Sequence, residues 1–144
     1  MVFFGEMSIF AEPYGDGCMA KTQEYMTLLI ALLICHYLAD FCLTSPTMIR
    51  AKADGRRLWP IAWHAAIHAL LMGVCLLIAG TDIIRTMMLM GFELITHFAI
   101  DTLKGRLTAR FTVLADQLQK PYWMVYGFDQ LLHLLVIVAI VAWG

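Results

Sequence analysis

The chain of 144 residues has little charge: 15% of it is Asp, Glu, Lys or Arg, whereas 61% is apolar and the mean hydropathy is +0.75. Soluble domains carry about a quarter charged residues. A soluble protein of this size also lacks the interior volume to bury so much apolar surface. The composition therefore argues against a soluble globular protein, and we expect the lipid bilayer to be the solvent. The net charge of −1 gives no reason to expect a nucleic-acid partner.

The sequence also lacks the Cys-x-x-Cys spacing of a zinc ribbon and shows no disulfide framework; its cysteines are Cys18, Cys35, Cys42 and Cys75. Cys35 and Cys75 fall inside apolar runs, so we expect them to pack in the interior. The first residues lack the basic start and the long apolar core of a signal peptide. We expect residues 1–22 to be a flexible or over-called tail without function and the domain to comprise residues 23–144.

Long apolar runs are what the sequence has instead. A helix needs about 20 mostly apolar residues to cross a bilayer core, and such runs occur at residues 25–43, 60–79, 83–101 and 122–143. Gly80-Thr81-Asp82 suits a tight turn between the second and third runs. We therefore predict an all-α fold, an integral membrane four-helix bundle, with up-down-up-down as the simplest topology.

Basic residues predict the orientation of this bundle. Eight of the ten Lys and Arg residues fall in the loops 44–59 and 102–121, namely Arg50, Lys52, Arg56, Arg57, Lys104, Arg106, Arg110 and Lys120. The positive-inside rule then predicts that both loops are cytoplasmic and that both termini lie outside. The second loop also has apolar residues at helical spacing, Leu107, Phe111, Leu114 and Leu118. We expect a short interfacial helix there, between spans three and four, that roofs the bundle or, alternatively, recruits an anionic lipid.

Each predicted span carries one pair of ionisable residues four positions apart: His36 and Asp40, His64 and His68, His97 and Asp101, and Asp129 and His133. This spacing places both members of a pair on one helix face. Because an ionisable group that faces lipid is costly, we expect all four pairs to point into the bundle. Their positions along the spans predict one slab near the cytoplasmic face. Within it, His36, His68, His97 and His133 form a deeper layer, and His64 and the three aspartates form a shallower one.

Imidazole and carboxylate groups in a helix bundle suit one or two divalent transition metals, such as Zn, Fe or Mn. Charge gives a second argument, because three buried aspartates without partners are very unfavourable. Two divalent cations and one hydroxide ion would neutralise them, and such a hydroxide is a nucleophile at neutral pH. The alternative is a metal-free polar or proton-relay network, since intramembrane Asp–His pairs also hold helices together.

Five further residues are candidates for supporting roles. Glu93 continues the stripe of His97 and Asp101 one turn deeper, as a further ligand, as an acceptor behind a ligand, or as a hydrogen-bond partner of another helix. Gln130 adjoins Asp129 and could orient a partner. The others could steer a phosphate or carboxylate head group, although such residues most often only set the topology; they are Arg56, Arg57 and Lys104.

The chain contains four motifs in order: His36-Tyr-Leu-Ala-Asp40-Phe41, the histidine pair after a basic loop, His97-x-x-x-Asp101-x-x-Lys104, and Asp129-Gln130-x-x-His133. Together they resemble the small bacterial membrane proteins of the family named domain of unknown function 3307, over residues 25–140. The family has a glutamine soon after the first Asp-Phe, where this chain has Thr44. The resemblance implies a bacterial inner-membrane protein but no established activity.

These features favour a membrane metalloenzyme, above all a metal-dependent hydrolase that acts on a lipid-like or anionic substrate at the cytoplasmic face. An oxidative di-iron reaction would use the same ligands. The alternatives are a metal-ion or proton transporter or channel, and a structural membrane subunit with a metal-free polar core. The outer halves of spans two and four have almost no polar residues, which favours a one-sided pocket over a permeation route. A homodimer is a further open expectation, because four short helices expose much surface.

Overall fold

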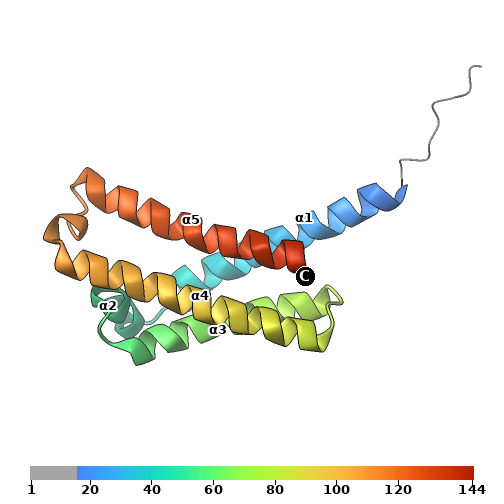
Figure 1. Cartoon of the computed structure of the whole chain (residues 1–144), viewed down its shortest axis with the longest axis horizontal. Coiled ribbons are helices and arrows are strands. Elements are labelled where there is room, and N and C mark those ends of the chain that lie inside the picture. The colour runs from blue at the N-terminus through green and yellow to red at the C-terminus, as the bar shows by residue number, and fades with distance from the viewer. Residues whose placement is uncertain (1–15) are drawn as a thin grey trace, which may run out of the picture.

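A computed structural model of the chain describes residues 16–144. Every regular element in this range is a helix: α1 (Asp16–Tyr37), the π-helical turn η1 (Leu38–Cys42), α2 (Pro46–Asp54), α3 (Leu58–Ile78), α4 (Ile83–Arg110), the 3-10 turn η2 (Thr112–Leu114) and α5 (Lys120–Trp143) (Figure 1). The described part of the chain is therefore all-α, as predicted. Of the expected N-terminal tail, residues 1–15 lie outside the described range and residues 16–22 form the first turns of α1.

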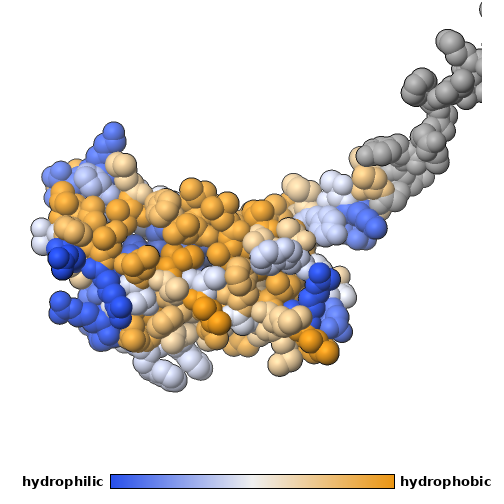
Figure 2. Space-filling model, viewed as in Figure 1, coloured by the Kyte–Doolittle hydropathy of each residue, from blue (hydrophilic) through white to orange (hydrophobic). Residues whose placement is uncertain are grey.

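Within residues 16–144, four helical segments are long and apolar enough to cross a membrane, and they coincide with the four predicted runs: Cys18–Cys42, Leu58–Ile78, Ile83–Arg110 and Lys120–Trp143. Many large apolar side chains on their outer surfaces are exposed, among them Ile78 and Ile95. Figure 2 shows hydrophobic residues over the middle of the bundle and hydrophilic residues gathered toward its ends. An exposed apolar surface of this extent is what a lipid environment covers.

The two ends of the bundle differ. Helix α2 and the connection between α4 and α5 lie at one end (Figure 1), which we call the basic end because it carries Arg50, Arg56, Arg57, Arg106, Arg110 and Lys120. The turn between α3 and α4 and the end of α5 lie at the other, which we call the apolar end. There the four long helices pack through one buried cluster: Leu32, Met72, Leu76, Leu89, Ile137, Ile140 and Val141. Toward the basic end the buried side chains are mostly polar, so the fold sets an apolar half beside a polar half.

Short polar signals set the helix boundaries. Ser45 caps α2 by accepting the backbone N–H of Met48 at 3.3 Å, and Pro46 follows in the first turn. The predicted turn at Gly80-Thr81-Asp82 is confirmed, since Gly80 has φ +85° and Asp82 caps α4. These signals fix where α2 and α4 begin, and hence where their polar residues lie.

The predicted short interfacial helix between spans three and four is wrong. Helix α4 continues without a break to Arg110, Phe111 is extended, and only the 3-10 turn Thr112–Leu114 follows before α5. That turn contains two β-branched residues, which are weak helix formers, and Asp116 favours a further turn by accepting the N–H of Leu118 at 3.0 Å. The short α-helix at this end is α2, which lies in the other loop.

Candidate metal centre

The four ionisable pairs meet in the polar half of the bundle. Each pair comes from a different part of the fold: His36 and Asp40 from α1 and η1, His64 and His68 from α3, His97 and Asp101 from α4, and Asp129 and His133 from α5. Seven of the eight residues are buried, and the Asp40 side chain is only 6% exposed. The structure thus brings together the whole set that the sequence singled out.

The imidazole rings of the deeper layer pack against one another. The ring centroid of His97 lies 3.8 Å from that of His68 and 4.1 Å from that of His133. The ring centroid of His36 lies 4.8 Å from that of His68 and 5.4 Å from that of His133. The four rings therefore form a closed circuit across the four long helices. A neutral imidazole is the form that binds metals, and this circuit places four imidazole rings side by side.

Many buried atoms of this cluster have no hydrogen-bond partner among residues 16–144. They include Nε2 of His36, His68, His97 and His133 and both carboxylate oxygens of Asp101. Some have an oppositely charged atom nearby, such as Lys52 Nζ at 3.2 Å from Asp101 Oδ2, but without hydrogen-bond geometry. Buried polar atoms without partners cost free energy. A bound cation would satisfy several of these atoms at once, so the residues present fit a metal ion.

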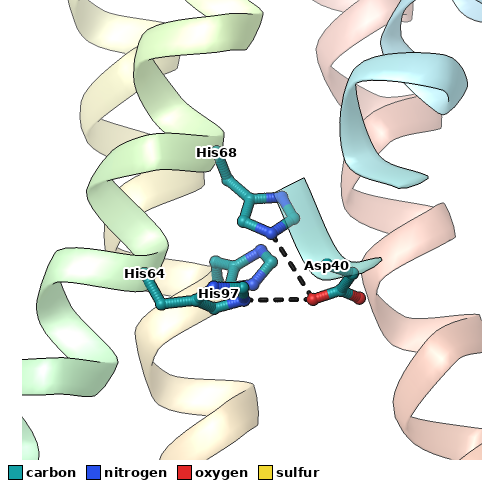
Figure 3. A group of neighbouring side chains, drawn as sticks. All are labelled: Asp40, His64, His68 and His97. Carbon is teal, nitrogen blue, oxygen red and sulfur yellow. Dashed lines mark hydrogen bonds and ion pairs between the residues drawn. The ribbon is translucent and has the colours of Figure 1, made fainter. Parts of the chain in front are cut away.

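In the part of the chain that the structure describes, two groups of side chains have ligand atoms close enough to share one cation each. The first is Asp40, His64, His68 and His97, and the second is His97, Asp101 and His133; in each group the ligand atoms lie within 4.8 Å of one another. Figure 3 shows the first group, in which His64 and His68 of α3 both approach the Asp40 carboxylate. His97 belongs to both groups and therefore lies at the centre of the site.

Glu93 fixes the orientation of His97. The Nδ1 of His97 lies 3.1 Å from Glu93 Oε1, one turn deeper on α4, so Nδ1–H donates to that carboxylate. The other nitrogen, Nε2, then presents its lone pair to the cluster, where Asp101 Oδ2 lies 3.6 Å away. A carboxylate behind a ligating imidazole is a common arrangement in metal sites. The geometry therefore fits one of the roles predicted for Glu93, that of a hydrogen-bond acceptor behind a metal-ligating histidine.

A lysine that the sequence marks only as a basic loop residue reaches into the cluster. Lys52 of α2 places its Nζ 2.9 Å from Asp40 Oδ1, 3.2 Å from Asp101 Oδ2 and 3.0 Å from His64 Nε2. Burial alone would lower the pKa of Lys52, but the carboxylates of Asp101 and Asp40 raise it by more, so its pKa lies above the usual value. Lys52 is therefore charged and serves as an internal counterion for two of the aspartates.

This ammonium group changes the charge balance from which two metal ions were inferred. Lys104 Nζ also lies 3.6 Å from Asp129 Oδ2, so the three aspartates and the Glu93 carboxylate (−4) face two lysines (+2), which leaves −2. One divalent cation brings this sum to zero, whereas a second cation would leave an uncompensated buried charge. Lys52 also occupies Asp40 Oδ1 and His64 Nε2 of the first ligand group. The geometry thus fits a single cation, in the second group.

Both ring nitrogens of His64 have partners. Thr44 Oγ1 donates to the carbonyl oxygen of Ala39 at 2.8 Å, so towards His64 Nδ1, 3.3 Å away, it can only accept. Nε2 lies 3.0 Å from both Lys52 Nζ and Asp40 Oδ1. Thr44 thus orients a cluster histidine through its hydroxyl.

Two glycines let α2 approach α4 closely enough for Lys52 to enter the cluster. A Cβ at Gly105 would lie 2.5 Å from the Lys52 carbonyl oxygen, and a Cβ at Gly55, whose φ is +62°, would lie 2.6 Å from the backbone nitrogen of Arg106. Thr108 Oγ1 adds a hydrogen bond to the α2 backbone at 3.1 Å. No periodic signal in the sequence distinguishes Lys52 from the other basic residues of its loop, because its placement depends on this long-range backbone contact.

Asp40 lies in a π-helical turn, Leu38–Cys42, that continues α1. Such turns are rare and frequently occur at functional sites. From this turn the Asp40 carboxylate lies 3.5 Å from His36 Nε2 on its own helix and 3.0 Å from His64 Nε2 on α3. The change of helical geometry therefore occurs where a carboxylate of the cluster is presented.

A cavity of about 450 Å³ opens beside the cluster at the basic end. Four charged residues line it, Asp40, Lys52, Lys104 and Asp129, together with hydroxyl and amide groups of Thr44, Thr108, Gln117, Tyr122, Tyr126 and Gln130. Gln130 donates to Asp129 Oδ2 at 3.3 Å. Two of the predicted residues, Arg56 and Arg57, do not line the cavity, and their side chains are exposed. The aspartate layer is thus reached from one end of the bundle.

Together these features define a class: a protein whose described part is helical, with four segments able to cross a membrane and a buried histidine–aspartate cluster that could hold a metal ion. The chain belongs to the family described as protein of unknown function (DUF3307), whose model matches residues 28–143. The resemblance drawn from the sequence motifs is therefore confirmed. Comparison with curated proteins and with solved structures finds no match. The function has to be argued from the site.

Proposed function

We propose that the protein binds one divalent transition metal ion, Zn, Fe or Mn, through His97, Asp101 and His133, and that it is a hydrolase acting on a substrate delivered by the membrane. The observation that carries this proposal is the convergence of buried imidazole and carboxylate atoms that have no partner among the described residues. A divalent metal in such a site supplies a Lewis acid and an activated water at neutral pH.

Other side chains of the cluster have positions that suit the accompanying proton transfers. His36 and His68 adjoin the ligand rings, and either neutral imidazole could accept a proton and pass it on. Asp129 lies 3.8 Å from His133 and also lines the cavity, so it connects the buried layer to the space that a substrate would enter. Lys52 holds Asp40 and Asp101 in a fixed arrangement.

We also propose an orientation in the membrane. The basic residues gather at the end that holds α2 and the connection between α4 and α5, and the positive-inside rule then makes this end cytoplasmic. The four spans run up-down-up-down, both termini lie outside, and the cavity opens toward the cytoplasm of a bacterial cell.

One specific observation favours a second candidate, a structural membrane protein with a metal-free polar core. Lys52 already pairs with Asp40 and Asp101, so part of the buried acid is neutralised without a metal. Transport has less support, because the buried cluster at the apolar end closes the bundle beyond the histidines. The two candidates differ in whether the folded protein holds a metal.

Metal content is measured by elemental analysis of protein purified in mild detergent and reconstituted separately with Zn, Fe and Mn. We expect about one tightly bound ion per chain in the wild type and in the loop control Asp116→Asn. Asp101→Asn and His133→Ala should lose the ion while keeping their helical circular dichroism. A folded wild type that retains none of the three metals would rule out the metal site and leave the metal-free core as the better explanation.

Hydrolysis is tested on the metal-loaded protein with phosphatidic acid and phosphatidylglycerol in mixed micelles, and products are identified by mass spectrometry. Turnover should be lost in His133→Ala and kept in Asp116→Asn. A metal-loaded protein that releases no product from either lipid would refute a phospholipid hydrolase while leaving metal binding intact.

A further inference from the structure

A second cavity meets the first at two shared residues. This groove, of about 480 Å³, runs between α4 and α5 on the outer surface of the bundle, and apart from Lys104 and Asp129 its lining is apolar, including Leu103, Leu107, Phe128 and Leu132. Lys104 and Asp129 also line the polar cavity beside the cluster. The pair therefore stands at the boundary between a lipid-facing groove and a polar chamber.

We infer that this pair of cavities binds one anionic phospholipid, with an acyl chain in the groove between α4 and α5 and the phosphate of the headgroup beside Lys104. The inference extends the proposed function, on which it rests for the reaction, by naming the substrate class. Both volumes fall in the range of ligand sites, about 300–1,000 Å³. An amphiphile is the ligand whose two parts match an apolar groove and a polar chamber that share a boundary.

The ammonium group of Lys104 is available to bind a negatively charged headgroup. Its Nζ forms no hydrogen bond within residues 16–144, and its nearest carboxylate oxygen, Asp129 Oδ2, lies 3.6 Å away. The side chain is 22% exposed and lines the polar cavity, and an ammonium group carries three N–H donors. Lys52, by contrast, is held by three short contacts. Lys104 is thus the lysine that can donate to a phosphate.

The charged residues in and around the polar cavity also bear on which headgroup it selects. The lining of the polar cavity is neutral in sum, because Asp40 and Asp129 balance Lys52 and Lys104. The exposed Arg106, Arg110 and Lys120 add positive charge at the same end of the bundle, outside the cavity. Basic residues at a membrane surface attract anionic lipids, each by about a fivefold factor in affinity. The chamber should therefore discriminate between anionic and zwitterionic headgroups.

The test uses the full chain in nanodiscs that contain a trace of lipid with a photoreactive diazirine in one acyl chain. Phosphatidic acid and phosphatidylcholine with identical chains are compared, and labelled peptides are identified by mass spectrometry. We expect phosphatidic acid to label residues 99–107 and 124–132 about fivefold more than phosphatidylcholine. Lys104→Gln should remove this preference, and Lys21→Gln, which changes an exposed lysine of α1 outside both cavities, should retain it.

A second variant tests the groove itself. Ala99 is exposed on the lining of the groove, so Ala99→Phe should fill it and reduce labelling there without disturbing the buried core. Ala142→Phe, an exposed position near the end of α5, is the matched control. Equal labelling by the two lipids, or a preference that survives Lys104→Gln, would overturn the inference and indicate ordinary contact with bulk lipid.

The two proposals fail in different ways. Labelling is measured on metal-loaded protein and again after treatment with EDTA. Loss of the metal site would appear in elemental analysis while the Lys104-dependent preference remained. Loss of the lipid site would appear in labelling while the metal content remained.

Discussion

Replacing Lys52 by methionine should destabilise the metal-free protein strongly. The ammonium group lies within 3.2 Å of Asp40, Asp101 and His64, and its side chain is only 16% exposed. Removing one partner of a buried ion pair typically costs about 3–5 kcal/mol, because the remaining charge is left uncompensated. Lys52→Met should therefore lower the free energy of unfolding by about this amount in the presence of EDTA.

A bound metal should reverse much of this loss. Binding only to the folded state stabilises by about 2.7 kcal/mol at a free metal concentration 100 times the Kd. Since the variant also lacks the cation that competes for Asp40 and Asp101, its metal-induced gain should exceed that of the wild type. Unfolding is followed in detergent with and without the metal, and Lys120→Met, an exposed lysine, is the control. A Lys52→Met protein as stable as Lys120→Met in EDTA would refute the role of Lys52 as counterion.

Three further predictions test separate parts of the structure. Gly105→Ala should destabilise the fold by about 1–3 kcal/mol, because the new Cβ would meet the Lys52 carbonyl oxygen at 2.5 Å. Gly127→Ala is the control and should not destabilise the fold, because its new Cβ would have no atom within 4 Å. Equal effects of the two substitutions in unfolding titrations would contradict the packing of α2 on α4. Glu93→Gln should weaken metal affinity about 10–100-fold in competition with a chelator, because His97 loses a charged acceptor; an unchanged Kd would exclude that role. Mild oxidation should join Cys35 and Cys75 in a disulfide, because their sulfurs lie 3.3 Å apart. The tryptic fragments on either side of α2 should then stay linked until the disulfide is reduced, and Cys75→Ser is the control. Separate fragments in the oxidised wild type would contradict the packing of α1 on α3.

The spans and the eight cluster residues were predictable because both follow from local patterns. Apolar runs of membrane length identify the helices. A four-residue spacing places each ionisable pair on one face, and the cost of exposing charge to lipid turns that face inward. The structure brings these residues together as the patterns indicated. Their roles as metal ligands stay a prediction.

The contribution of Lys52 could not be predicted from such patterns. Its position depends on a backbone contact between segments about fifty residues apart in sequence, where Gly55 and Gly105 leave room for α2 against α4. The interfacial helix was predicted wrongly for a related reason. An apolar stripe at helical spacing marks one helix face, but it does not tell whether the helix is separate or, as here, the end of α4 followed by turns.

The most direct test of the central claim is the X-ray absorption spectrum of the zinc-loaded protein. The site described here predicts a first shell of nitrogen and oxygen at about 2.0–2.2 Å, with the outer-shell scattering of at least two imidazoles and no sulfur. His133→Ala, which should lose the ion, should give no spectrum of protein-bound zinc. A spectrum of water ligands alone, or one with sulfur at about 2.3 Å, would contradict the account, because it would place the metal away from the histidine–aspartate cluster.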